Sequence, residues 1–124
     1  MNLKAKAIEC TTLSRLMNDR EKVDTDYIIE HFPEGVTLSE VDVVTTVDHD
    51  SGEIEDHYAV VTYKEEPEKF FCGGLVLTNI VDCWMTEFKT TVELSAQVAK
   101  DNIKVKLEKS KTKNNKTCTK ITII

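Results

Sequence analysis

The chain has 124 residues, a mass of 14.1 kDa and a formal net charge of -6, with 40% apolar and 31% charged residues. This composition is typical of a globular domain, and four Gly and two Pro exclude collagenous and low-complexity classes. No apolar run approaches the ~20 residues of a membrane-spanning helix, and the first six residues lack the apolar core of a signal peptide. We therefore expect a single domain over residues 1–124, located in the cytoplasm and without membrane contact.

The charge is divided along the sequence. Residues 1–99 carry 8 Lys and Arg against 20 Asp and Glu, whereas residues 100–124 carry 8 Lys against 2 acids. A basic segment on an acidic body indicates a charged partner such as a polyanion, or lysines that keep a solvated hairpin soluble. The acidic body opposes non-specific DNA binding over most of the surface, so any contact with nucleic acid must be local.

The first part of the chain, residues 1–35, is predicted to be a helical N-terminal segment. Apolar residues recur every three or four positions over residues 3–20, which predicts one helix or two short pieces. A second short helix is expected to begin at Asp24 or Thr25, which are capping residue types, and to end before Pro33.

Two long β segments follow. Residues 36–47 are rich in Val and Thr, and residues 54–64 form a second stretch of high β propensity. The polar turn between them contains Gly52, so the pair is predicted to be an antiparallel hairpin. Pro67, which lies among acidic residues, is expected to end the second strand, because proline cannot continue a β ladder.

The best helix of the chain is predicted at residues 75–88, directly after the aromatic and glycine-rich run from Lys69 to Gly74. Its apolar residues form one continuous stripe that is expected to face a sheet. A shorter helix is expected at residues 91–99 with Val92, Leu94 and Val98 facing inward. The stripe of the first helix consists of Leu77, Ile80, Val81, Trp84, Met85 and Phe88.

A hairpin is predicted at the C-terminus, over residues 102–124. Ile103, Val105 and Leu107 alternate with charged residues, which is the pattern of a half-buried strand. A long polar tip separates this strand from the return strand at residues 118–124.

This order of elements predicts an α+β, β-rich fold. If residues 36–47 bend across the sheet, the order is that of an OB-fold-like five-stranded barrel, with a helix between strands 3 and 4 and a helical N-terminal extension. The β core would span residues 36–124. The lysine-rich tip at residues 109–116 would then be the loop between strands 4 and 5, which commonly touches the ligand. The alternative is a plain α+β sandwich with helices on one face of an antiparallel sheet.

Motifs for catalysis or metal binding are absent from the sequence. The four cysteines show no CxxC spacing and no histidine in a zinc-ligand pattern, so we expect reduced thiols and no metal site. No nucleotide-binding, hydrolase or metalloprotease signature occurs. The chain is therefore expected to be neither an enzyme nor a cofactor-binding protein.

Two stretches of the sequence are distinctive. One is the run Lys-Phe-Phe-x-Gly-Gly-x-Val-Leu-Thr at residues 69–78. The other is the stretch from Ile103 to Asn114 in the C-terminal part of the chain. Over roughly residues 13–124 the chain resembles small, mostly uncharacterised proteins of phages and prophages of gut Firmicutes. Some small phage proteins that bind single-stranded DNA have a comparable order of elements. The resemblance implies an OB fold, single-stranded-DNA binding and a location in the host bacterial cytoplasm.

The hypothesis that we favour is a single-stranded nucleic-acid-binding protein that acts through its basic C-terminal hairpin. Such proteins combine a basic groove with aromatic side chains on which bases stack. The candidate phosphate contacts are Lys104, Lys106, Lys109, Lys111, Lys113 and Lys116, and the candidate stacking residues are Tyr58, Tyr63 and Phe71.

Two alternatives stay open. The many carboxylates over residues 19–68 can form an acidic face, as in an inhibitor or adaptor that binds a basic host protein by DNA mimicry or counters a host defence. The apolar C-terminal strand, which ends at Ile123 and Ile124, can instead pair edge to edge in a homo-oligomer.

Overall fold

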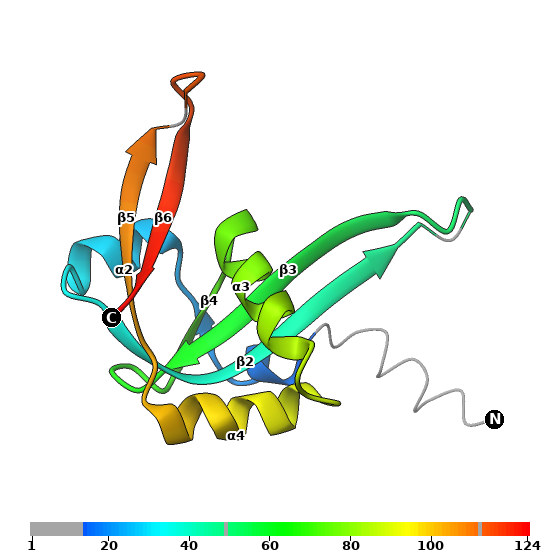
Figure 1. Ribbon diagram of the computed structural model, residues 1–124, viewed down its shortest axis with the longest axis horizontal. Helices are drawn as coiled ribbons and strands as arrows, with labels where there is room; N and C mark the ends of the chain where they lie inside the picture. The colour runs from blue at the N-terminus through cyan, green and yellow to red at the C-terminus, as the bar shows by residue number, and fades with distance from the viewer. Residues whose placement is uncertain (1–13, 49, 112) are drawn as a thin grey trace.

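The computed structural model describes residues 14–48, 50–111 and 113–124. Over these residues the protein is a β-rich α+β chain whose strands form a six-stranded sheet, curled into a half barrel and ordered β1-β4-β3-β2-β5-β6 (Figure 1). The strands are β1 (Glu21–Lys22), β2 (Val36–Val47), β3 (Ile54–Tyr63), β4 (Lys69–Cys72), β5 (Lys104–Lys111) and β6 (Thr117–Ile123). The helices are the 3-10 helix η1 (Arg15–Met17), α2 (Thr25–His31), α3 (Leu75–Met85) and α4 (Thr91–Asp101).

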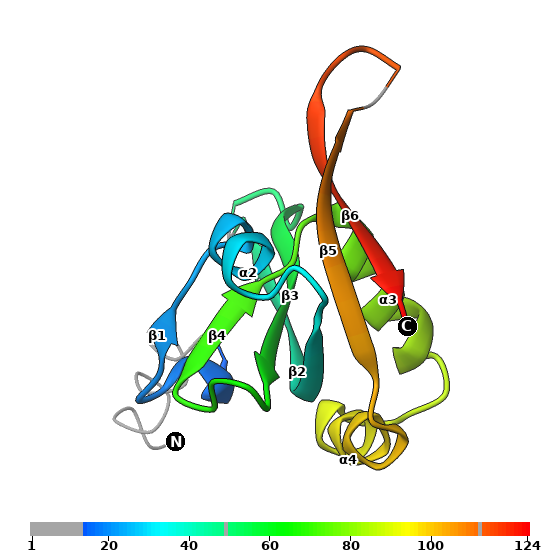
Figure 2. The same cartoon turned by 90° about the vertical axis from the view of Figure 1, so that its left-hand side faces the viewer.

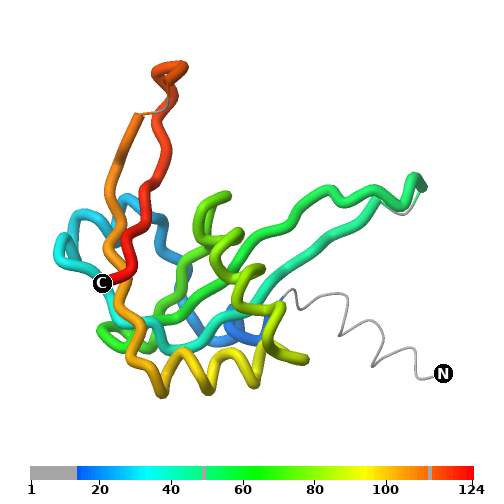
Figure 3. Tube along the Cα trace, in the orientation of Figure 1, coloured from blue at the N-terminus to red at the C-terminus, as the bar shows by residue number. Residues whose placement is uncertain are grey.

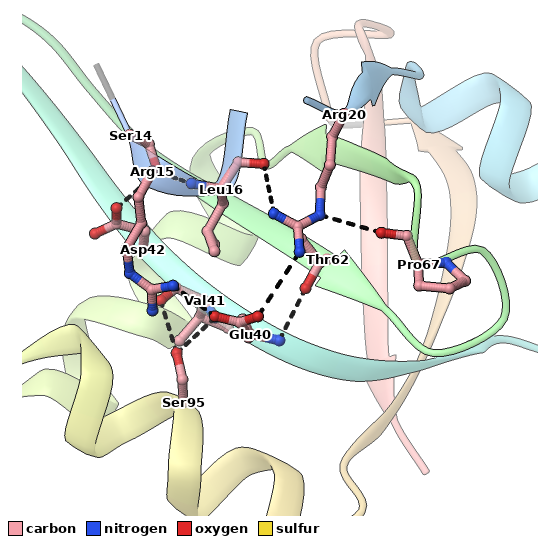
Figure 4. A network of polar contacts seen from close by, with 10 residues as sticks. All are labelled: Ser14, Arg15, Leu16, Arg20, Glu40, Val41, Asp42, Thr62, Pro67 and Ser95. Atoms are coloured by element: carbon pink, nitrogen blue, oxygen red, sulfur yellow. Dashed lines mark hydrogen bonds and ion pairs between the residues drawn. The ribbon is translucent and has the colours of Figure 1, made fainter. Parts of the chain in front are cut away.

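Strand β2 joins the two halves of the sheet. Most of it pairs with β3, while its first two residues pair with β5. Between Leu38 and Val41 the register with β3 shifts, because β2 contains one residue more than β3 there, and such a bulge bends the strand. The Glu40 N–H donates to Thr62 Oγ1, and Val41 exchanges two hydrogen bonds with the Ser95 hydroxyl of α4 (Figure 4). The bulge is therefore also the point at which α4 is attached to the sheet.

The larger hydrophobic core lies between the sheet and the two long helices, α3 and α4. Leu77 and Val81 of α3 and Leu94 and Val98 of α4 are buried in it, as the helical spacing predicts. Val92 departs from the prediction because its side chain is 60% exposed.

A smaller hydrophobic cluster occupies the other face of the sheet. The segment at residues 14–20 crosses this face and buries Leu16 against residues of β2, β3 and β4. Three polar contacts hold the segment in place (Figure 4). Ser14 Oγ donates to Asp42 Oδ2 at 2.7 Å, Arg15 Nη1 lies 2.7 Å from Glu40 Oε2, and Arg20 Nε donates to the Pro67 carbonyl at 3.1 Å.

Several predicted boundaries are confirmed and others are corrected. Strand β2 has the predicted limits, and β3 ends one residue before the predicted end. The predicted helix at residues 75–88 ends at Met85. The helical assignment of residues 1–35 is wrong at Glu21–Lys22, which form β1 parallel to β4 and raise the number of strands in the sheet from the predicted five to six. The part of the predicted N-terminal helix at residues 3–13 lies outside the described residues.

Two β-hairpins project from the body as arms. The β2–β3 hairpin and the β5–β6 hairpin extend from the body in diverging directions, as the Cα trace in Figure 3 shows. Seen from the side, the β5–β6 hairpin is a twisted ribbon that rises above the helices (Figure 2). Strand β6 forms one edge of the sheet, as the predicted C-terminal edge strand requires.

Replacement of Gly35 tests how closely the chain approaches itself before β2. Gly35 has a φ of +111°, and an added Cβ would lie 2.6 Å from the Val105 carbonyl oxygen. A Gly35→Ala variant is expected to lose about 1–3 kcal/mol of unfolding free energy in urea titrations. Gly52 is the matched control, because its φ is also positive, at +73°, but no atom lies within 4 Å of the added Cβ. Equal losses in the two variants would contradict the role of the close approach to Val105.

Candidate nucleic-acid interface

Residues 104–120 of the β5–β6 hairpin are here called the basic arm, since they include seven lysines and one glutamate. Its base is held by Val105 and Leu107, which are buried in the core. Beyond Leu107 both strands leave the core, and the side chains of Glu108, Lys109 and Lys111 are exposed. The alternation of apolar and charged residues therefore forms an arm that is anchored at one end and solvated at the other.

The register of the hairpin divides the lysines between two faces. Lys104 and Lys106 share one face because side chains of a strand alternate. Lys109 and Lys111 lie on the opposite face, across from Thr119 and Thr117 of β6. The six predicted lysines consequently do not form a single stripe. They surround a twisted ribbon, and Lys113 and Lys116 lie at its tip.

Two lysines of the arm form ion pairs with carboxylates of the described residues. Lys109 Nζ lies 2.6 Å from Asp26 Oδ1 of α2, and Lys106 Nζ lies 3.8 Å from Glu108 Oε1. Both pairs are exposed and contribute little to stability. Within the described part of the chain, no ion pair is formed by Lys104, Lys111, Lys113 or Lys120. The arm therefore carries a concentrated positive potential on an otherwise acidic molecule.

A cleft lies between the basic arm and the N-terminal end of α3. Its volume is about 450 Å³. Leu75 and Val76 contribute exposed apolar surface from α3, while Thr117 and Thr119 contribute hydroxyl groups from β6. Lys111 and Lys109 are the cross-strand neighbours of these two threonines, so basic side chains flank the cleft.

The predicted stacking residues are not brought to the basic arm. Tyr63 and Phe71 are fully buried, with ring centroids 5.8 Å apart, so neither ring is accessible to a nucleobase. The Tyr63 hydroxyl donates to Glu66 at 2.8 Å, and burial together with this contact raises the pKa of Tyr63. Both residues belong to the core, because the alternation of β3 and β4 directs them toward the helices.

Tyr58 is the one predicted aromatic residue that reaches the surface. It is half-buried on the outer face of β3, in a pocket of about 390 Å³ that it shares with Lys22 and Phe70. Burial raises the pKa of Tyr58, and the nearby Cys72 and Asp56 raise it further, which keeps its hydroxyl protonated. This pocket is separate from the cleft beside the basic arm.

The second projecting hairpin carries the opposite charge. Residues 45–57, here called the acidic arm, contain five carboxylates and no lysine or arginine. None of these carboxylates forms an ion pair with another described residue. The sequence shows the acids but not that a hairpin projects them from the body. They are Asp48, Asp50, Glu53, Glu55 and Asp56.

A chain of hydrogen bonds connects the acidic arm to α3. Thr45 Oγ1 lies 2.8 Å from His57 Nδ1, and His57 Nε2 lies 2.8 Å from Asp82 Oδ2 of α3. All three groups are solvent-accessible, with the His57 and Asp82 side chains 36% and 43% exposed. The contact connects the base of the acidic arm to α3. Sequence reasoning missed it, because the three residues lie on three different elements.

Among residues 14–48, 50–111 and 113–124, no group of three or more His, Cys, Asp or Glu side chains is arranged to hold a metal ion. In the same part of the chain, every helix is too short or too polar to cross a membrane.

Comparison of the chain with protein-family models, with curated proteins and with solved structures finds no match. Its function must therefore be inferred from surface chemistry. Three features of that surface stand out: a basic arm, an acidic arm, and an apolar cleft flanked by lysines.

Proposed function

We propose that this protein binds single-stranded nucleic acid through its basic arm. The observation that carries the proposal is the concentration of seven lysines on one projecting hairpin of a chain whose net charge is -6. Lysines that neutralise phosphates release condensed counterions, which supplies affinity without sequence preference. A twisted ribbon with lysines on both faces suits a flexible strand, which can follow its surface.

The arrangement of the sheet supports this proposal through an OB-like interpretation of the fold. Strands β2, β3 and β4, then helices, then β5 and β6 follow the element order of that fold. In OB folds, ligands contact the second and third strands and the loops that join strands 1 to 2 and 4 to 5. The corresponding parts here are the Tyr58 pocket, the acidic arm and the basic arm. Of these, the basic arm attracts phosphate groups, while Tyr58 provides an aromatic ring for base stacking beside Lys22.

Neutralising two lysines tests the proposal. A Lys111→Gln/Lys113→Gln variant is expected to bind a fluorescent single strand more weakly, with the slope of log K against log[salt] smaller by about 1.4. The matched control is Lys89→Gln/Lys100→Gln, which removes the same charge from exposed positions outside the arm. Equal weakening by both variants would contradict binding at the arm.

The acidic arm favours a second candidate function, an inhibitor or adaptor that binds a basic, DNA-binding host protein. Its five carboxylates are presented on a projecting hairpin, as electrostatic complementarity to such a partner requires. In a pull-down from host lysate, the partner should bind the wild-type chain stoichiometrically, be displaced by duplex DNA and be lost with Glu53→Lys/Glu55→Lys. Retention of the partner by this variant would contradict the acidic arm as the binding surface.

A further inference from the structure

We infer that copies of this chain associate head to tail, with the acidic arm of one copy seated in the cleft beside the basic arm of the next. The two arms carry opposite charge and diverge from the body, so that their tips lie far apart (Figure 1). Contact between them is therefore a contact between two molecules. This inference concerns self-association and does not depend on the binding of nucleic acid.

The acidic arm carries an apolar pair among its charges. Val47 and Ile54 are cross-strand partners, with side chains 45% and 65% exposed. Glu53 and Glu55 flank Ile54 along the strand, and Asp48 follows Val47. Exposed apolar pairs with a charged rim are typical of protein interfaces, whose centre is apolar and whose edge is polar.

The cleft beside the basic arm has the complementary composition. Leu75 and Val76 of α3 are 77% and 42% exposed and, with Ile121 of β6, give it apolar walls. Lys109 and Lys111 lie on the same face of the arm as the threonines of the cleft. An apolar pair with carboxylates beside it in the chain thus meets an apolar cleft beside Lys111 and the ion-paired Lys109, so hydrophobic burial and charge complementarity act together.

The geometry of the contact determines the kind of assembly. Because the two surfaces differ, the contact is heterologous, and a pair of copies keeps one free acidic arm and one free basic arm. Such contacts generate closed rings or open chains. The charged rim makes the association salt-dependent, since the Debye length shortens from about 14 Å at low ionic strength to about 5 Å near 0.3 M.

Sedimentation velocity of the full chain tests the inference. At about 50 mM salt the wild-type protein is expected to exceed the monomer mass of 14.1 kDa, and to return to it in high salt. Glu53→Lys/Glu55→Lys and Lys111→Glu/Lys113→Glu are each expected to remain monomeric when alone and to associate when mixed. The control Glu30→Lys/Glu34→Lys changes exposed carboxylates outside the arm and is expected to associate as the wild type does.

Two results would overturn the inference. One is a wild-type chain that stays monomeric at low salt, or a mixture of the two variants that does not associate. The other is an assembly that persists in high salt and in both variants, which would indicate pairing through the edge of β6. The Glu53→Lys/Glu55→Lys variant keeps every lysine of the basic arm, so loss of association without loss of oligonucleotide affinity separates this inference from the proposed function.

Discussion

A Phe71→Ala variant is expected to unfold with a free energy about 3–5 kcal/mol below that of the wild type. Phe71 is fully buried between β3 and the helices, and its ring packs on that of Tyr63. Truncation to alanine removes the buried ring and leaves a cavity that the rigid sheet cannot close. Urea denaturation followed by the fluorescence of the single Trp84 measures the loss.

Phe71 and Tyr58 provide a comparison that separates core aromatics from surface aromatics. Tyr58→Ala is expected to cost less stability, because this side chain is only half-buried. Phe71→Leu keeps most of the buried volume and is expected to leave oligonucleotide affinity unchanged. A folded Phe71→Leu variant with reduced affinity would contradict the placement of Phe71 in the core and restore it as a stacking residue.

A Glu66→Ala variant is expected to lose about 2–4 kcal/mol, because one carboxylate satisfies three donors. Glu66 Oε1 accepts from the Tyr63 hydroxyl at 2.8 Å, and Oε2 accepts from the Tyr27 hydroxyl at 3.0 Å and lies 3.1 Å from Lys69 Nζ. Its removal leaves the buried Tyr63 hydroxyl without this acceptor. The cluster also connects α2 to the β3–β4 turn, so both elements are expected to lose stability in the variant. Chemical denaturation of the variant, with Glu68→Ala as an exposed control, measures the effect.

The contribution of Glu66 should depend on pH. Burial raises the pKa of its carboxyl, but the hydrogen bonds from Tyr63, Lys69 and Tyr27 outweigh that effect and place the pKa below its ordinary 4.5. A carboxyl whose pKa is lower in the folded state stabilises the protein above pH 4.5 and loses that stabilisation as the pH falls through the folded value. The difference in stability between wild type and Glu66→Ala is therefore expected to shrink below pH 4.5. A difference that stays constant from pH 7 to pH 3 would contradict an ionised Glu66 in the cluster.

The strands and helices with strong periodicity were predictable, whereas the contacts between distant segments were not. The Val- and Thr-rich stretch of β2 and the apolar stripe of α3 are patterns within single segments. The sequence alone therefore predicts where these two elements lie. Strand β1 has two residues and no pattern, and it exists because Glu21 and Lys22 meet β4. The bulge in β2 is hydrogen-bonded to Ser95, which lies 54 residues away from Val41, a contact that no local pattern predicts.

The candidate site was predictable in composition and not in arrangement. Counting lysines identifies the basic arm, but only the register of β5 with β6 shows that Lys109 and Lys111 lie across from the threonines that line the cleft. Alternation alone cannot tell which face of β3 is covered, so Tyr58 and Tyr63 were equivalent candidates. The helices decide between them, because they bury Tyr63 and leave Tyr58 near the surface.

Titration of a fluorescent single strand of roughly 30 nucleotides, and of its duplex, tests the central claim most directly. With about six lysines on phosphates, the affinity for the single strand should fall about a thousand-fold between 50 mM and 300 mM salt, a slope near -4. The single strand should bind more tightly than the duplex at both salt concentrations. No binding at 50 mM salt would contradict a nucleic-acid function for the basic arm and leave its lysines to contacts between proteins.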